Sequence, residues 1–343
     1  GMAQRLRVIQ YGVGSIGSSI VKLLLERGEM EIVGALDVSE QKIGKDLGEV
    51  VSVGRKLGIT VSNDPNYLFS KTRADIVLHS TSSFLKDVYP QITRAVEAEM
   101  NVISTAEELA YPYSRHPEVA EEIDQTARKH GVTVLGAGVN PGFVMDALVV
   151  ALTGVCSHVR RVKATRIVDA STRRLPLQRK VGAGLDVESF KEKVVSGTLG
   201  HVGLLESIDM IAGSLGWKLE KVEQKTDPVI AKENMRTEFF ELKAGTVAGI
   251  RQIGRGVKEG EELITLDLQM YVGAKDPRDS IAIEGTPNID LTIRGGIHGD
   301  IATAAIVVNS IPRVMAAHPG LVTMKDLPMP ALTINNLFES TKR

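Results

Sequence analysis

A glycine-rich turn near the start of the chain constrains the fold more than any other feature. Gly12, Gly14 and Gly17 follow an apolar run at residues 6–11, and Asp37 ends a second apolar run. This G-x-G-x-x-G spacing, with a helix-like segment behind it and an acid about 20 residues on, is typical of a dinucleotide-binding βαβ unit. A glycine-rich strand–helix turn without a ligand is the alternative.

The same pattern predicts how the ligand is held. A pyrophosphate would sit on the N–H groups that open the helix, beside Ser15 and Ile16. Asp37 would accept hydrogen bonds from the adenosine ribose and repel a 2′-phosphate, which predicts NAD as the cofactor. Lys42 and Lys45 lie close by in the sequence and could neutralise such a phosphate, so NADP is possible.

Composition narrows the class of protein. A chain of 343 residues has room for two domains, and its net charge of −1 gives no reason to expect nucleic acid or an anionic membrane as a partner. The single cysteine, Cys156, suits a reducing compartment. We find no apolar run of ~18 residues and no histidine spacing typical of a metal site. We therefore expect a cytoplasmic protein that binds no membrane and no metal.

The order of the predicted elements indicates an α/β chain in two domains. Strand-like and helix-like runs alternate over residues 1–151, which predicts a Rossmann domain with a doubly wound parallel sheet. Residues 152–298 read as a second α+β domain with an open mixed sheet. Residues 299–343 are predicted to return to the Rossmann domain as a helix and tail, and the basic segment 171–180 to be a loop.

Hydroxyl groups follow one of the central predicted strands. In open α/β sheets, ligands bind beyond the carboxyl ends of the strands, where Ser80, Thr81 and Ser82 are expected. Their hydroxyls suit a nicotinamide ribose. Ser82 or Ser83 could equally serve as the N-cap of the helix that starts at Phe84.

Acids and an amide follow the neighbouring strands. Burial near a nicotinamide ring would raise the pKa of Glu107 or Glu108 and suit it to proton transfer, although both could simply be first-turn helix acids. Asn140, before Pro141, could hold the cofactor's carboxamide or the substrate. His201 opens another predicted helix and could face the substrate, or could only cap or pack.

Several motifs together resemble the 2,4-diaminopentanoate dehydrogenases and the related native amine dehydrogenases. The likeness runs nearly from end to end, and it extends more distantly to dihydrodipicolinate reductase and meso-diaminopimelate dehydrogenase. The segments that carry it are 8–14, 78–84, 107–112, 138–143, 200–203, 284–288 and 323–328.

This resemblance implies a reversible, NAD(P)-dependent oxidative deamination of an amine or diamino acid to a ketone and ammonia, on a homodimer. We therefore expect residues 152–298 to form the substrate-binding and dimerisation domain. Glu107 best matches the family's acid that handles ammonia, with Glu108 as the second choice, and Asn140 and Arg166 match residues of the substrate pocket. The basic segment 171–180 departs from the family, either as a solvated loop or as a site for a substrate carboxylate or phosphate. A C=N reductase similar to dihydrodipicolinate reductase and a non-catalytic NAD sensor are the alternative functions.

Overall fold

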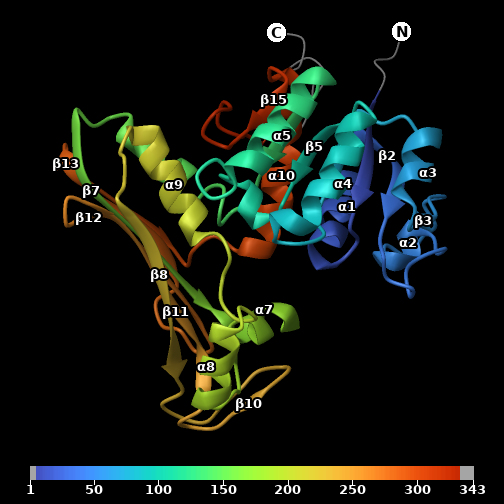
Figure 1. Cartoon of the computed structure of the whole chain (residues 1–343). Coiled ribbons are helices and arrows are strands. Elements are labelled where there is room, and N and C mark those ends of the chain that lie inside the picture. The colour runs from blue at the N-terminus through green and yellow to red at the C-terminus, as the bar shows by residue number, and fades with distance from the viewer. Residues whose placement is uncertain (1–4, 333–343) are drawn as a thin grey trace. The chain divides into compact units, whose positions relative to one another are not determined.

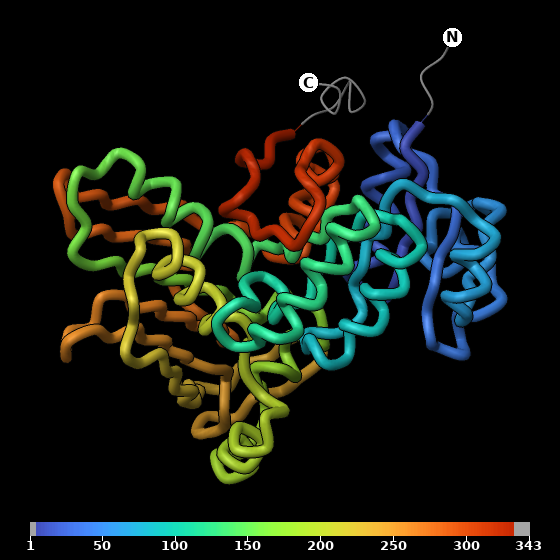
Figure 2. Tube along the Cα trace, turned by 45° about the horizontal axis from the view of Figure 1, so that its top comes forward, coloured from blue at the N-terminus to red at the C-terminus, as the bar shows by residue number. Residues whose placement is uncertain are grey.

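The computed structural model describes residues 5–332 of the chain. It contains two compact units (Figures 1 and 2). Unit 1 combines the described parts of residues 1–143 and 298–343, and unit 2 is residues 144–297. The unit boundary precedes the predicted one at residue 151, because helix α6 (Ala147–Thr153) packs against α9 (Leu204–Leu215) of unit 2. The predicted tail beyond residue 332 lies outside the described residues.

Unit 1 is built on a seven-stranded sheet in the order β15-β6-β5-β4-β1-β2-β3, in which every pair is parallel. The predicted doubly wound sheet is thus confirmed. The chain runs outward from β1 in one direction and from β4 in the other, so the carboxyl ends of these two strands flank the point where ligands bind in such sheets. The strands are β1 (Leu6–Tyr11), β2 (Met30–Leu36), β3 (Val61–Ser62), β4 (Ile76–His79), β5 (Asn101–Ser104), β6 (Thr133–Gly136) and β15 (Gly320–Val322).

Helices cover both faces of this sheet (Figure 2). Helices α4 and α5 pack together over one face, whose core includes Val77, Val88, Ile92 and Ile123. Helix α10 packs against α1 and β5 on the other face. The helices are α1 (Ser15–Arg27), α2 (Leu47–Val50), α3 (Pro65–Lys71), α4 (Leu85–Glu97), the 3-10 helix η1 (Glu107–Leu109), α5 (Pro117–Lys129) and α10 (Gly299–Ala316).

Unit 2 contains a six-stranded sheet in the order β14-β13-β7-β12-β11-β8. Strand β7 pairs with β12 in parallel and with β13 antiparallel, so the sheet is mixed, as predicted. Along β7, Arg161 and Lys163 are exposed whereas Val162 and Ala164 are buried, which gives the sheet a charged outward face and an apolar inward face. The strands are β7 (His158–Asp169), β8 (Lys221–Ile230), β11 (Val247–Lys258), β12 (Glu261–Tyr271), β13 (Arg278–Thr286) and β14 (Ile289–Arg294), with a short ribbon of β9 (Met235–Arg236) and β10 (Glu241–Leu242).

The prediction that the basic segment 171–180 is a loop is wrong, because the segment is mostly helical. The 3-10 helix η2 (Ala170–Thr172) and helix α7 (Leu175–Lys180) occupy it, and α8 (Val187–Val195) follows. Asp169 caps η2 by accepting the N–H of Ser171. A proline in the first turn of α7 suits the start of a helix, where an N–H is unpaired in any case. Within residues 5–332, no helix is both long and apolar enough to cross a membrane.

Candidate active site

The glycine turn is fixed by close backbone packing. A Cβ atom at Gly17 would lie 1.9 Å from the Gly12 carbonyl oxygen, and one at Gly12 would lie 2.3 Å from the Ser80 carbonyl oxygen. Gly12 also has φ near +97°, which disfavours any side chain. A Cβ at Gly14 would meet no atom within 4 Å, so open space borders the N-terminus of α1. This is the geometry that a pyrophosphate requires.

Gln10 supports this turn from inside the sheet, and sequence reasoning missed it. It is fully buried on β1, and its Nε2 donates to the Gly12 carbonyl oxygen (2.9 Å) and to the Ser80 hydroxyl (3.1 Å). Ser80 thus faces the glycine turn. A polar residue directly after the apolar pair Val8 and Ile9 of a strand was the available signal, since a buried amide needs partners.

Asp37 is held beside the same turn at the end of β2. Its Oδ2 accepts the N–H of Val13 (2.7 Å) and its Oδ1 the N–H of Ser39 (2.9 Å). A carboxylate has about four lone-pair sites, so these two bonds leave capacity for ribose hydroxyls. Lys42 donates to the Val13 carbonyl oxygen (2.8 Å), which keeps its ammonium group near Asp37.

Glu107 and Glu108 have different surroundings. Glu108 Oε1 accepts the N–H of Leu85, the first residue of α4 (2.8 Å), and its Oε2 lies 3.2 Å from His116 Nε2. Glu107 Oε2 instead accepts the hydroxyl of Ser83 (2.5 Å). Both oxygens of Glu108 therefore serve structural contacts, whereas Glu107 is oriented by a side chain from the loop after β4.

The start of α4 differs from the expectation that Ser82 or Ser83 is its N-cap. The N-cap residue is Phe84, which makes no side-chain capping bond. Ser82 accepts the N–H of Phe84 at 3.3 Å and donates to Asp87 (2.9 Å). The carboxylate of Glu108 takes the place of a capping side chain, because it accepts a helix N–H from outside the helix.

Asn140 follows β6 and presents a buried acceptor. Its Oδ1 has no hydrogen-bond partner among the residues that the structure describes. An unpaired buried polar atom costs about 1–3 kcal/mol, so a native site that keeps one points to a ligand that pairs with it. The side chain can accept an amide N–H, as the prediction for Asn140 requires.

Arg166 and His201 belong to unit 2, where each is held by hydrogen bonds to a polar side chain. Arg166 is 4% exposed, and its Nη1 lies 2.8 and 2.7 Å from the two carboxylate oxygens of Asp279. Burial and the positive charges of Lys180 and Arg166 lower the pKa of His201 to about 3, so the imidazole is neutral. Gln252 holds the backbone of His201 through bonds of 3.0 and 2.8 Å. His201 Nε2 is buried without a partner among the described residues.

Asp279 and Gln252 escaped the sequence reading, because single polar residues inside long strands resemble solvent-facing positions. The structure also shows that, within residues 5–332, no three His, Cys, Asp or Glu side chains gather as a group that could hold a metal ion.

Comparison with known proteins shows which families this chain resembles. A model of the 2,4-diaminopentanoate dehydrogenase C-terminal domain matches residues 143–343, and a model of the dihydrodipicolinate reductase N-terminus matches residues 6–135. A 2,4-diaminopentanoate dehydrogenase from Acetoanaerobium sticklandii is 37% identical over 95% of this chain and 94% of its own length. An amine dehydrogenase from Streptomyces virginiae is 24% identical over 94% of this chain and 96% of its own.

Solved structures agree with this likeness. An amine dehydrogenase from Mycobacterium smegmatis superposes with a TM-score of 0.86 at 29% identity, covering 96% of this chain and 98% of that one. A dihydrodipicolinate reductase from Paenisporosarcina shares the fold with a TM-score of 0.53 at 14% identity, over 94% of this chain and 99% of its own.

The packing of the glycine turn predicts opposite outcomes for two substitutions. Gly14→Val should leave the thermal unfolding midpoint unchanged, because its Cβ meets no atom of the chain within 4 Å. It should weaken NADH binding at least about tenfold, since losing the pyrophosphate contacts costs more than ~1.4 kcal/mol. Gly17→Ala should lower both the midpoint and the affinity. Fluorescence titration with NADH checks this, and a Gly14→Val variant that binds NADH normally would contradict it.

Proposed function

Because the chain belongs to the 2,4-diaminopentanoate dehydrogenase family, we propose that it catalyses reversible oxidative deamination of an amine or diamino acid. It is an NAD(P)-dependent oxidoreductase acting on a CH–NH2 group, and the products are a ketone and ammonia. The observation that carries this proposal is the carboxylate of Glu107, which Ser83 orients just beyond the carboxyl end of β5. A carboxylate there can bind an ammonium group and accept its proton.

The residues around the carboxyl ends of the strands fit the cofactor. The open space at Gly14 and the unpaired acceptor of Asn140 support this assignment most directly. When bound, NAD supplies a hydride acceptor at C4 of the nicotinamide. We assign the pyrophosphate to the turn and helix start (Gly12, Gly14, Ser15, Ile16 and Gly17), the adenosine ribose to Asp37, the nicotinamide ribose to Ser80, Thr81 and Ser82, and the carboxamide to Asn140 and Pro141.

Glu107 is the proposed acid–base group. Its carboxylate binds the substrate's ammonium and takes one proton, which leaves a neutral amine that can release a hydride from its carbon. The resulting iminium carbon is attacked by water, and the C–N bond breaks to give the ketone and ammonia. In the reverse direction the same carboxylate takes a proton from ammonium, so that ammonia can attack a ketone. The bond from Ser83 holds the carboxylate in one orientation for each of these transfers.

Unit 2 supplies the proposed substrate contacts, Arg166 and His201. Asp279 and the Ile297 carbonyl hold the guanidinium of Arg166 in one position, so Arg166 would offer the substrate a fixed hydrogen-bond donor whose charge is already paired. The buried, unpartnered Nε2 of His201 supports a role in hydrogen bonding to substrate.

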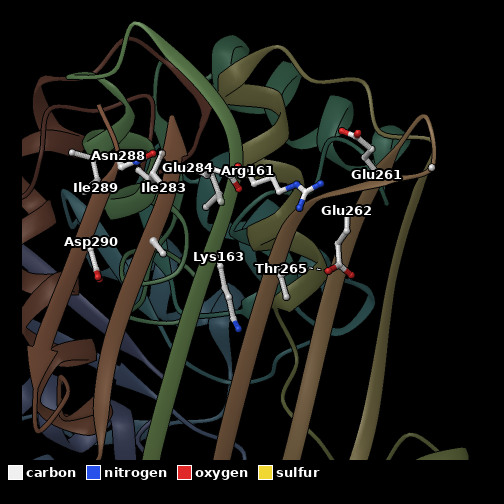
Figure 3. A pocket seen from close by; sticks show the side chains of 13 residues that line it. Arg161, Lys163, Glu261, Glu262, Thr265, Ile283, Glu284, Asn288, Ile289 and Asp290 are labelled. Atoms are coloured by element: carbon white, nitrogen blue, oxygen red, sulfur yellow. Dashed lines mark hydrogen bonds between the residues drawn. The ribbon is translucent and has the colours of Figure 1, made fainter. Parts of the chain in front are cut away.

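We also propose that the protein is a homodimer formed through unit 2. An open hollow of about 610 Å³ lies on the outward face of its sheet (Figure 3). Arg161 and Lys163 lie in the middle of the hollow, with acids on both sides. The ion pairs of these acids among the described residues are with Arg160 and Arg255, not with Arg161 or Lys163. A second copy would bring acids opposite these bases if the two-fold axis passes between the bases and one row of acids, since such an interface pairs a surface with itself. Glu284 and Glu262 already pair with Arg160 and Arg255 within the chain, so Glu261 and Asp290 are the acids that such a contact would engage first. The acids are Glu261, Glu262, Glu284 and Asp290.

Lys163→Glu should therefore shift the protein from dimer to monomer, because the substitution replaces a base in the middle of this surface with an acid that would face the acids of the second copy. Light scattering after size exclusion measures the mass. Lys22→Glu, at an exposed position on α1, is the matched control and should keep the parental mass. A monomeric parent protein would contradict the dimer, and a Lys163→Glu variant that stays dimeric would contradict this interface.

A cytoplasmic location completes the proposal. The single cysteine supports it, because one cysteine forms no disulfide within the chain and suits a reducing compartment.

The cofactor preference follows from Asp37. A 2′-phosphate would approach this carboxylate, so we expect a higher kcat/KM with NAD than with NADP. Initial rates with both cofactors, against amines, diamino acids and hydroxy acids, measure this preference and the substrate class together. A preference for NADP of about tenfold or more would show that Lys42 outweighs Asp37. Turnover of hydroxy acids alone would contradict the proposed reaction.

Glu107→Gln should lower amine oxidation at least ~100-fold, the usual loss when a general base is removed. NADH affinity should barely change, because the substitution keeps the size of the side chain. Glu108→Gln is the matched control and should be much milder, since an amide oxygen still accepts the N–H of Leu85. A large loss in Glu108→Gln with normal turnover in Glu107→Gln would move the acid–base role to Glu108.

A further inference from the structure

We propose that His79 is a positioning residue for the nicotinamide ribose, and that it acts through the hydroxyl of Thr81. The proposal rests on the dinucleotide site proposed above. His79 is the last residue of β4 and is 1% exposed, whereas Thr81, two residues later, is exposed. A buried imidazole thus lies directly behind a side chain that a ligand can reach.

Four side chains form one hydrogen-bond network at the ends of β4 and β5. His79 Nδ1 lies 2.9 Å from the Ser104 hydroxyl, and its Nε2 lies 2.6 Å from Gln91 Oε1. Thr81 Oγ1 lies 2.7 Å from the same Gln91 oxygen and 3.1 Å from His79 Nε2. Gln91 comes from α4, so strand, loop and helix all meet at this network.

The chemistry of these groups fixes the direction of each bond. An amide oxygen only accepts, so His79 Nε2 carries the proton that points to Gln91. Burial lowers the pKa of His79 to about 4, so its ring is neutral and Nδ1 is an acceptor for the Ser104 O–H. Ser104 Oγ in turn accepts the N–H of Ala106 (3.1 Å). The donors of His79, Ser104 and Thr81 in this network therefore each have an acceptor.

Thr81 receives a defined role from this arrangement. Its O–H donates to Gln91, so its oxygen has only lone pairs left for a ligand. An exposed acceptor beyond the carboxyl end of β4 matches a ribose O–H, which is a donor. Without His79 the Gln91 amide could rotate and present its NH2 to Thr81, and the hydroxyl would then lose its fixed direction.

The packing around His79 restricts its ring further. The ring meets Tyr11 edge to face, with centroids 5.2 Å apart. Its bond to Ser104 reaches the loop after β5, because Ser104 also holds Ala106, the residue before Glu107. His79 thus connects the loop that carries Thr81 with the loop that carries the proposed acid–base group.

Binding measurements with NADH and ADP test the proposal, because ADP has the adenosine and pyrophosphate parts but no nicotinamide ribose. His79→Phe and Thr81→Val should each weaken NADH binding roughly twofold to tenfold, the range for one lost hydrogen bond between uncharged groups. Both should leave ADP binding unchanged. The double variant should bind NADH no more weakly than Thr81→Val alone, because His79 acts only through Thr81.

If His79→Phe impairs folding, Gln91→Met tests the proposal instead. It removes the oxygen that accepts from both His79 and Thr81, so it should weaken NADH binding by a similar factor. Thr126→Val, which removes a hydroxyl bonded within α5, is the control and should change neither affinity. Weaker ADP binding in His79→Phe, or losses that multiply in the double variant, would mean a structural role and overturn the proposal. Unchanged NADH binding in His79→Phe would overturn it too. A parent protein that binds neither ligand would instead overturn the dinucleotide site itself.

Discussion

Close contact between backbones at the glycine turn determines most of what unit 1 can do. Gly17 has no room for a Cβ because the Gly12 carbonyl lies in that space, and Gly12 has none because the Ser80 carbonyl does. The turn therefore packs directly against the residue that follows β4. The buried Gln10 of β1 connects the two, because it donates to the Gly12 carbonyl and to the Ser80 hydroxyl. With both flanking glycines fixed, the space at Gly14 stays open beside the N-terminus of α1, where the proposed pyrophosphate contacts would form.

Glu107 and Glu108, which follow β5 at this same edge of the sheet, have different hydrogen-bond partners and therefore different roles. Glu108 is occupied by a helix N–H and by His116, so it holds α4 and η1 together. Glu107 is oriented by a hydroxyl that comes from the loop after β4. A general base must be held in position and lie within hydrogen-bond reach of the proton that it takes. Glu107 suits this role better than Glu108, because both oxygens of Glu108 already hold structural contacts. Thr81, fixed by His79 and Gln91, would give the nicotinamide ribose a similarly directed contact on the neighbouring loop.

Much of unit 1 could be predicted from the sequence, because parallel strands buried on both faces read as apolar runs and the glycine spacing is specific. The candidate residues at the strand ends followed from the rule that ligands bind at those ends. What the residues contact could not be predicted, since Gln10 bridges Gly12 to Ser80, 70 residues further on, and Gln91 reaches His79 and Thr81 from another element. Helix α7 was missed because its basic residues suggested a solvated loop. The first predicted unit boundary was late because α6 reads as a continuation of the preceding unit.

Coupled formation of NADH and ammonia tests the central claim most directly. With NAD and 2,4-diaminopentanoate as substrates, the account predicts one ammonium released for each NADH formed, at every time point. Deuterium placed on the carbon that loses its amine should appear on the nicotinamide of the product. NADH formed without ammonium, or a reduced cofactor that lacks the deuterium, would contradict oxidative deamination by this protein.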